Sequence, residues 1–173
     1  VYPLDMLPIA FPDIGTVSLA PLLGAIPEYG ANNVWYRPDP GFSPENDREL
    51  RLDRESGAWL GLVETTLRVK EQAAGRYFTG CPAVCPNLDV LAEVRGTEAL
   101  MMDLILAPDW VHQKLQEIHR VFVEVYNELY RIIREEDSSS VFAYFMLWAP
   151  GTVCLAQCDT AAMISRGMFE AFV

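Results

Sequence analysis

A long run of apolar residues at helical spacing is the feature that most constrains this chain. The α-helix repeats every 3.6 residues, so positions that step by four and three fall on one face. That face is formed by Val111, Leu115, Ile118, Phe122, Val125, Leu129 and Ile132. We predict one long helix that starts at Pro108, with Asp109 as its N-cap and the apolar face packed on a core. His112 and His119 lie about 10.5 Å apart along this helix, too far to share one metal.

Strand and helix patterns alternate along the rest of the chain. Short β-prone or apolar runs occupy residues 6–11, 33–37, 76–80, 141–148 and 153–157, and helical patterns occupy residues 18–24, 58–74 and 90–96. In the helix at 58–74, Leu60, Val63 and Leu67 suit an apolar face. The charged residues of 45–55 are typical of a solvated surface. This alternation predicts an α/β fold with a mostly parallel sheet or barrel.

Composition narrows the classes of partner. A chain of 173 residues with 51% hydrophobic residues can build one core, so we predict a single domain over residues 1–173. A formal net charge of −11 disfavours nucleic-acid backbones and anionic membranes. No apolar run is long enough for a membrane span, and residues 1–5 carry no basic secretion signal. The expected partner is therefore a small molecule and the expected location is the cytoplasm.

The four cysteines, Cys81, Cys85, Cys154 and Cys158, form two pairs with three residues between the members of each pair. Zinc sites commonly use a spacing of two, so no metal site is predicted from these residues. Reduced, largely buried thiols are the expected state in the cytoplasm.

Polar residues follow the last predicted strand, which ends at residue 157. Asp159 and Thr160 come where that strand should stop, and Ser165 is a predicted N-cap for a helix with Met168, Phe169 and Phe172 on its apolar face. Ligands of α/β proteins bind at such strand-to-helix junctions. The alternative is that Asp159 only caps a turn, as Asp often does.

This segment, Asp159-Thr160 followed by Ile164-Ser165 and a helix with Phe169 and Phe172, resembles the uroporphyrinogen decarboxylase family. Three other segments fit the same pattern: Phe11-Pro-Asp13-Ile14 with Leu23-Gly24, Gly80-Cys-Pro82, and Arg95-Gly96-x-Glu98. The resemblance implies a portion of a (β/α)8 TIM-type barrel, whose remainder would come from further residues or from a second copy of the chain in a homodimer. Because the chain lacks a starting Met and ends within a helical pattern, we expect it to be a fragment.

The resemblance also implies site residues. Asp13 corresponds to the acidic residue that faces pyrrole N–H groups, so Asp13 and then Asp159 are the catalytic candidates. Thr160, Asp89 and Arg95 are the substrate-binding candidates. Each has a structural alternative: Asp13 precedes Gly15 in a predicted turn, and Arg95 suits the negative end of a helix before Gly96.

Three functions follow from the resemblance. The first is a cofactor-free enzyme of the uroporphyrinogen decarboxylase type, acting on a carboxylated tetrapyrrole or a related ligand. The second is a methyltransferase of the same superfamily, which would use a corrinoid or zinc. The third is a non-catalytic ligand-binding homologue. Ala92 stands where the decarboxylases have a substrate-contacting Tyr, which weighs against authentic decarboxylase activity.

Overall fold

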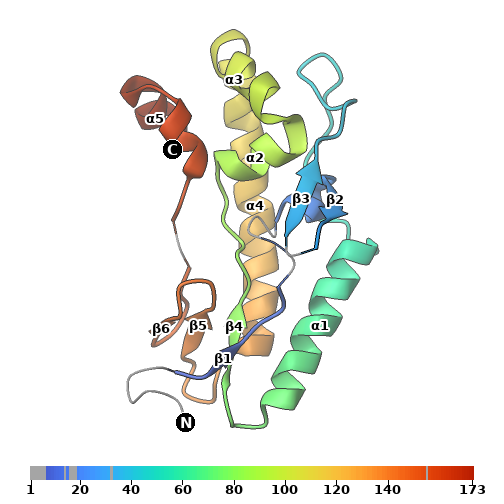
Figure 1. The fold of residues 1–173 in the computed structure, drawn as a ribbon. Helices are drawn as coiled ribbons and strands as arrows, with labels where there is room; N and C mark the ends of the chain where they lie inside the picture. Colours follow the sequence, from blue (N-terminus) through green and yellow to red (C-terminus); the bar gives the residue numbers. More distant parts are fainter. Residues whose placement is uncertain (1–6, 14, 16–18, 32, 155) are drawn as a thin grey trace.

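The computed structural model describes residues 7–13, 15, 19–31, 33–154 and 156–173, and these residues form a mixed α/β structure (Figure 1). Its α-helices are α1 (Gly57–Ala73), α2 (Leu88–Arg95), α3 (Thr97–Leu106), α4 (Pro108–Ile133) and α5 (Arg166–Phe172), and its 3₁₀ helices are η1 (Ala20–Leu23) and η2 (Asp159–Met163). Its strands are β1 (Ile9–Ala10), β2 (Ile26–Tyr29), β3 (Val34–Arg37), β4 (Phe78–Cys81), β5 (Ser140–Phe142) and β6 (Leu147–Ala149). No helix in these ranges combines the length and the apolarity needed to cross a membrane.

The main sheet has the order β1-β4-β5-β6, and its first three strands are parallel. The strands predicted at 33–37 and 76–80 are confirmed as β3 and β4, and the one at 6–11 as β1, with Met6 outside the described residues. Gly80 lies at the centre of this sheet, where an added Cβ would come 2.4 Å from the Cβ of Ala143. Only glycine therefore allows β4 to approach the end of β5 this closely.

Helix α4 is the predicted long helix, and it packs against α1, α2, α3, β4 and β5. Its predicted stripe is buried at Val111, Leu115, Ile118, Val125 and Leu129, and Phe122 and Ile132 are partly buried. The prediction of Asp109 as N-cap is wrong. The N-cap is Ala107, because Pro108 fits the first helical position, where no N–H donor is needed.

Helix α1 forms as predicted, but its apolar face was predicted wrongly. Leu60 and Leu67 are 54% and 50% exposed, and Val63 is only partly buried. The face that packs on α4 and β4 instead contains Trp59, Leu62, Thr66 and Ala73. The centre of this face lies about 120° around the helix from Leu60 and Leu67, at 3.6 residues per turn.

Residues 141–148 do not form the single strand that was predicted. Strands β5 and β6 are antiparallel, with Phe142 opposite Leu147, and the Met146 N–H donates to the Ala143 carbonyl to close the turn. Met146 adopts φ 52°, a left-handed conformation that a Met residue in the sequence does not predict. Val141 and Phe142 of β5 are buried, whereas Tyr144, Phe145 and Met146 of the turn are exposed, so only the start of the uncharged run is a buried strand.

The strand predicted at 153–157 is also absent from the described residues of that segment, and residue 155 lies outside them. Side chains bond its backbone instead. The Tyr126 hydroxyl accepts from the Val153 N–H at 2.8 Å and donates to the Val153 carbonyl at 2.7 Å. The Asn87 amide donates to the Gln157 carbonyl. Asp159 and Thr160 therefore start η2 instead of ending a strand, while Ser165 caps α5 as predicted.

The charge-rich segment at 45–55 is more than a solvated surface. The ammonium of Lys114, 0% exposed on α4, binds Asp47 and Glu117 at 2.8 Å each and the Arg48 carbonyl at 2.9 Å. Glu117 also accepts from the buried Leu50 N–H at 2.8 Å. Burial alone would raise the pKa of Glu117, but these hydrogen bonds and the nearby charge of Lys114 hold it below its ordinary value.

Replacing Lys114 should therefore be costly. Lys114→Met leaves Glu117 buried without its cation, and we expect the free energy of unfolding to fall by about 3 kcal/mol in urea denaturation. Arg120→Ala, on the exposed side of the same helix, is the matched control and should change it by less than about 0.5 kcal/mol. Equal effects of the two substitutions would contradict this account.

Candidate functional site

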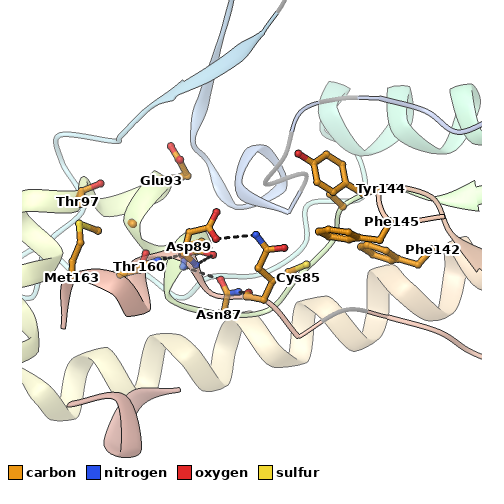
Figure 2. A pocket seen from close by; sticks show the side chains of 14 residues that line it. Cys85, Asn87, Asp89, Glu93, Thr97, Phe142, Tyr144, Phe145, Thr160 and Met163 are labelled. Atoms are coloured by element: carbon orange, nitrogen blue, oxygen red, sulfur yellow. Dashed lines mark hydrogen bonds between the residues drawn. The ribbon is translucent and has the colours of Figure 1, made fainter. Parts of the chain in front are cut away.

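A cavity of about 340 Å³ lies at the carboxyl ends of β4 and β5 (Figure 2). Five parts of the chain line it: the segment that follows β4, helix α2, the first turn of α3, the end of β5 with the β5–β6 turn, and the region of η2. The lining residues are Ala83, Cys85, Asn87, Asp89, Ala92, Glu93, Thr97, Phe142, Tyr144, Phe145, Gln157, Asp159, Thr160 and Met163. Polar and aromatic side chains thus meet where parallel strands end.

Asp89 is the polar centre of this cavity. It stands in the first turn of α2, after the N-cap Asn87, whose side-chain oxygen accepts the Asp89 N–H at 2.8 Å. Its own carboxylate accepts the N–H groups of Asp159 at 2.9 Å and Thr160 at 2.7 Å. The first N–H groups of a helix have no partner within that helix, so a carboxylate from α2 caps η2. This pair of bonds fixes η2 across the cavity from α2.

Glu93 lies one helical turn after Asp89 and also lines the cavity. Burial raises the pKa of Glu93, and the negative charge of Asp89 raises it further. Glu93 was not predicted as a site residue. The signal in the sequence was its position four residues after Asp89, which places both side chains on one face of α2.

Asp159 and Thr160 both line the cavity. The Asp159 side chain is exposed and accepts from the Gln157 amide at 2.8 Å. Thr160 is buried, and its backbone N–H is already used by Asp89. The structure thus brings together Asp89, Asp159 and Thr160 of the five predicted site residues.

Asp13 is not among the described residues that line this cavity. Its carboxylate accepts the Gly15 N–H at 3.1 Å, which is the turn interaction that was the alternative. Gly15 lies against the hydroxyl of Tyr36, where its added Cβ would come within 2.7 Å. Burial raises the pKa of Tyr36, and the charges of Glu93 and Asp13 add to this effect. Asp13 therefore lies near Tyr36 on β3, whose pKa is also raised by the charge of Glu93.

Arg95 is also not among the described lining residues. Its Nε donates to Asp103 Oδ2 at 2.7 Å, in an ion pair whose side chains are 19% and 9% exposed. Arg95 ends α2, and Gly96 follows with φ 95°. Arg95 thus lies in the last turn of α2 before Gly96, which is the structural alternative, and its ion pair with Asp103 also joins α2 to α3.

Three aromatic rings form another wall of the cavity and were missed by sequence reasoning. Phe142, Tyr144 and Phe145 come from the end of β5 and its turn (Figure 2). The Phe142 and Phe145 rings stack with centroids 6.5 Å apart, and Tyr144 meets Phe145 edge-on at 5.1 Å. They were missed because residues 141–148 were predicted to form one strand, and that prediction contains no turn in which these rings could line a cavity.

The four cysteines are free thiols in this structure. Burial raises the pKa of Cys85 to about 11, with added effects of Cys154, Asp89 and Asp159. Burial likewise raises the pKa values of Cys81 and Cys158. Thiols with raised pKa values stay protonated near neutral pH and are poor nucleophiles. Within the described ranges, no group of three or more His, Cys, Asp or Glu side chains is placed to hold a metal ion.

We compared the chain with known protein families, proteins and structures. The chain matches no protein family, no curated protein and no solved structure.

Asp89→Ala should release η2. The loss of both acceptor bonds should speed amide hydrogen exchange at Asp159 and Thr160 by about tenfold, because a bond to a charged acceptor contributes roughly 1.5 kcal/mol. Glu98→Ala, in the first turn of α3, is the control and should leave these two amides protected. Unchanged exchange at Asp159 and Thr160 in Asp89→Ala would refute the capping role.

The raised pKa of Glu93 predicts a pH-dependent stability. The unfolded chain loses the Glu93 proton at lower pH than the folded chain, so this residue lowers the stability of the fold as pH rises through the two pKa values. Glu93→Gln cannot ionise. The free energy of unfolding of this variant, minus that of the unchanged protein, should therefore be larger at pH 8 than at pH 4 in urea denaturation.

The control for this measurement is Glu71→Gln, at an exposed position on α1. Its effect on the free energy of unfolding should be the same at both pH values. A Glu93→Gln effect that does not change with pH would show that burial does not perturb this carboxyl group.

Proposed function

We propose that residues 1–173 are a portion of a (β/α)8 barrel related to the uroporphyrinogen decarboxylase family, and that the cavity binds a small-molecule substrate. The parallel neighbours β1, β4 and β5 support the barrel, since helices connect them as in a β/α repeat. The observation that carries the function is the position of the cavity at the carboxyl ends of β4 and β5. Active sites of such barrels lie at that end.

The chemistry of the cavity suits a substrate that presents N–H groups and develops positive charge. The carboxylates of Asp89, Glu93 and Asp159 are hydrogen-bond acceptors when ionised. In decarboxylation of a pyrrole side chain, protonation of a ring carbon makes the ring cationic. The bond to the carboxylate then breaks, carbon dioxide leaves, and its electron pair neutralises the ring. A fixed carboxylate stabilises the cation before that step.

We assign these two roles to different residues. Glu93, with its raised pKa, holds a proton more readily than an ordinary Glu and is the proton donor. Asp159 is the group that stabilises the cation. Its side chain is exposed, and its carboxylate accepts a hydrogen bond from the Gln157 amide. Asp89 positions the site, because its oxygens are used by the η2 backbone. Asp13 remains a candidate from the resemblance, beside Tyr36.

The test is turnover of uroporphyrinogen, followed by chromatography of the products with fewer carboxyl groups. We expect Glu93→Gln to lower kcat by about 100-fold, the usual contribution of a general acid. Asp159→Asn should also lower kcat, and Glu71→Gln should not. Asp13→Ala decides whether the residue named by the resemblance takes part, because unchanged turnover in that variant removes it from the mechanism.

Absence of uroporphyrinogen turnover by the unchanged protein would contradict the decarboxylase. Stoichiometric zinc in the purified protein would then favour the methyltransferase of the same superfamily. No zinc and no turnover would favour the non-catalytic homologue.

A further inference from the structure

Two segments without regular structure run side by side along one wall of the cavity. The first follows β4 and leads into α2, and the second follows β6 and leads into η2; in Figure 1 both run from the main sheet towards α2 and α5. The Asn87 amide donates to the Gln157 carbonyl, and the Asp89 carboxylate accepts the Asp159 N–H. Both contacts join residues 70 positions apart, so the two segments are parallel and keep one register.

This register brings two cysteines together. Extended back from Asn87 and Gln157, it brings Cys85 to within one position of Cys154. The residue before Cys154 is fixed, because the Tyr126 hydroxyl bonds both backbone groups of Val153. A single Asn side chain spans the gap between the segments, so their backbones lie at about the separation that a disulfide bridges, roughly 6 Å between Cα atoms.

The electrostatic effect of one thiol on the other agrees with this geometry. Burial raises the pKa of Cys85 to about 11, and among the neighbouring charges Cys154 contributes most, ahead of Asp89 and Asp159. Both carboxylates line the cavity together with Cys85. Because the interaction of charges falls with distance, this order indicates that the Cys154 thiol lies close to that of Cys85.

We propose that Cys85 and Cys154 form a reversible disulfide that ties the segment before η2 to the segment before α2. Cys154 is exposed and can meet an oxidant, whereas Cys85 is partly buried beside it. The other two thiols are less suited, since Cys81 is 0% exposed in the core and the Cys158 thiol lies 3.8 Å from the Asp89 carboxylate.

Glutathione disulfide is the oxidant in this proposal. The Cys154 thiolate attacks one sulfur of glutathione disulfide, its S–S bond breaks, and one glutathione leaves as a thiolate. The Cys85 thiolate then attacks the sulfur of Cys154, and the second glutathione leaves. Two protein thiols are thus oxidised to one disulfide, one glutathione disulfide is reduced to two glutathione molecules, and the protons of the protein thiols pass to them.

The disulfide acts on the wall of the cavity that few contacts hold. The segment of residues 150–158 has no strand pairing in its described part, and α5 beyond it has no buried residue. A covalent link at Cys154 removes conformations that this segment reaches when it opens. We therefore expect the oxidised protein to keep η2 closed over α2 for a larger share of the time, whatever ligand the cavity holds.

The test oxidises the folded protein. It is incubated with glutathione disulfide at pH 8.5, where more of each thiol is ionised than at neutral pH, and free thiols are then blocked with N-ethylmaleimide. Peptide mapping without reductant should show Cys85 linked to Cys154, and dithiothreitol should release the link. Amide hydrogen exchange at Asp159 and Thr160 should be at least about threefold slower in the oxidised protein.

Three substitutions separate the thiols. Cys158→Ser is the matched control in the same segment and should still form the disulfide. Cys154→Ser removes the exposed thiol and should form none. Cys85→Ser keeps the exposed thiol but lacks its partner, so Cys154 should retain one bound glutathione.

A link of Cys154 to Cys81 or Cys158, a link of Cys81 to Cys85, or no link in the folded protein would overturn the proposal. A Cys85–Cys154 link that leaves amide exchange at Asp159 and Thr160 unchanged would overturn its action on the cavity wall. The result does not depend on uroporphyrinogen turnover, so failure of this proposal and failure of the proposed function are distinguishable.

Discussion

The cavity depends on one carboxylate that serves two elements. Asp89 belongs to the first turn of α2, yet its oxygens accept the backbone N–H groups that begin η2, seventy residues later in the chain. The segment that leads to η2 has no strand pairing in the described residues, so side chains supply its bonds. Asn87 donates to Gln157, Tyr126 exchanges two hydrogen bonds with Val153, and Ser140 donates to the Gly151 carbonyl at 2.7 Å. A few polar contacts thus hold the η2 wall of the cavity, while α2, which also lines the cavity, packs on α4 through buried apolar residues.

This division has consequences for motion. The residues of α4 that face the core are almost fully buried, so opening that part of the molecule exposes much apolar surface. The segment of η2 and α5, of which η2 lines the cavity, buries far less: α5 has no buried residue, and its Phe172 stacks on the exposed His112 with centroids 4.5 Å apart. Segments with few buried apolar contacts open at lower free energy than the core. We therefore expect the η2 wall of the cavity to open at lower free energy than the core around α4.

The parts of the fold that the sequence predicted are those with dense local signals. The stripe of α4 spans about six turns, and Ser165 caps α5 with the bond expected of an N-cap. Where the signal depended on tertiary context, prediction failed. The residues of α1 offer two apolar faces, and only the positions of α4 and β4 decide that Leu62 is buried and Leu60 is exposed. The β5–β6 turn contains no Gly, Pro or Asn, so nothing in the run of 141–148 marks Met146 as left-handed.

The same limit applies to the site. Sequence patterns selected Asp159 and Thr160 because they follow a predicted strand; the structure brings them to the cavity by a different route, through the bonds of their N–H groups to Asp89. Three carboxylates in one cavity repel one another. The surroundings of each carboxylate offset this repulsion in a different way. Asp89 accepts two backbone N–H groups, and Asp159 is exposed and accepts from Gln157. Glu93 is partly buried beside Asp89, and this setting raises its pKa. Glu93 is thus the carboxyl group whose charge responds most directly to what enters the cavity: a cation would favour its ionised form, and an anion its protonated form.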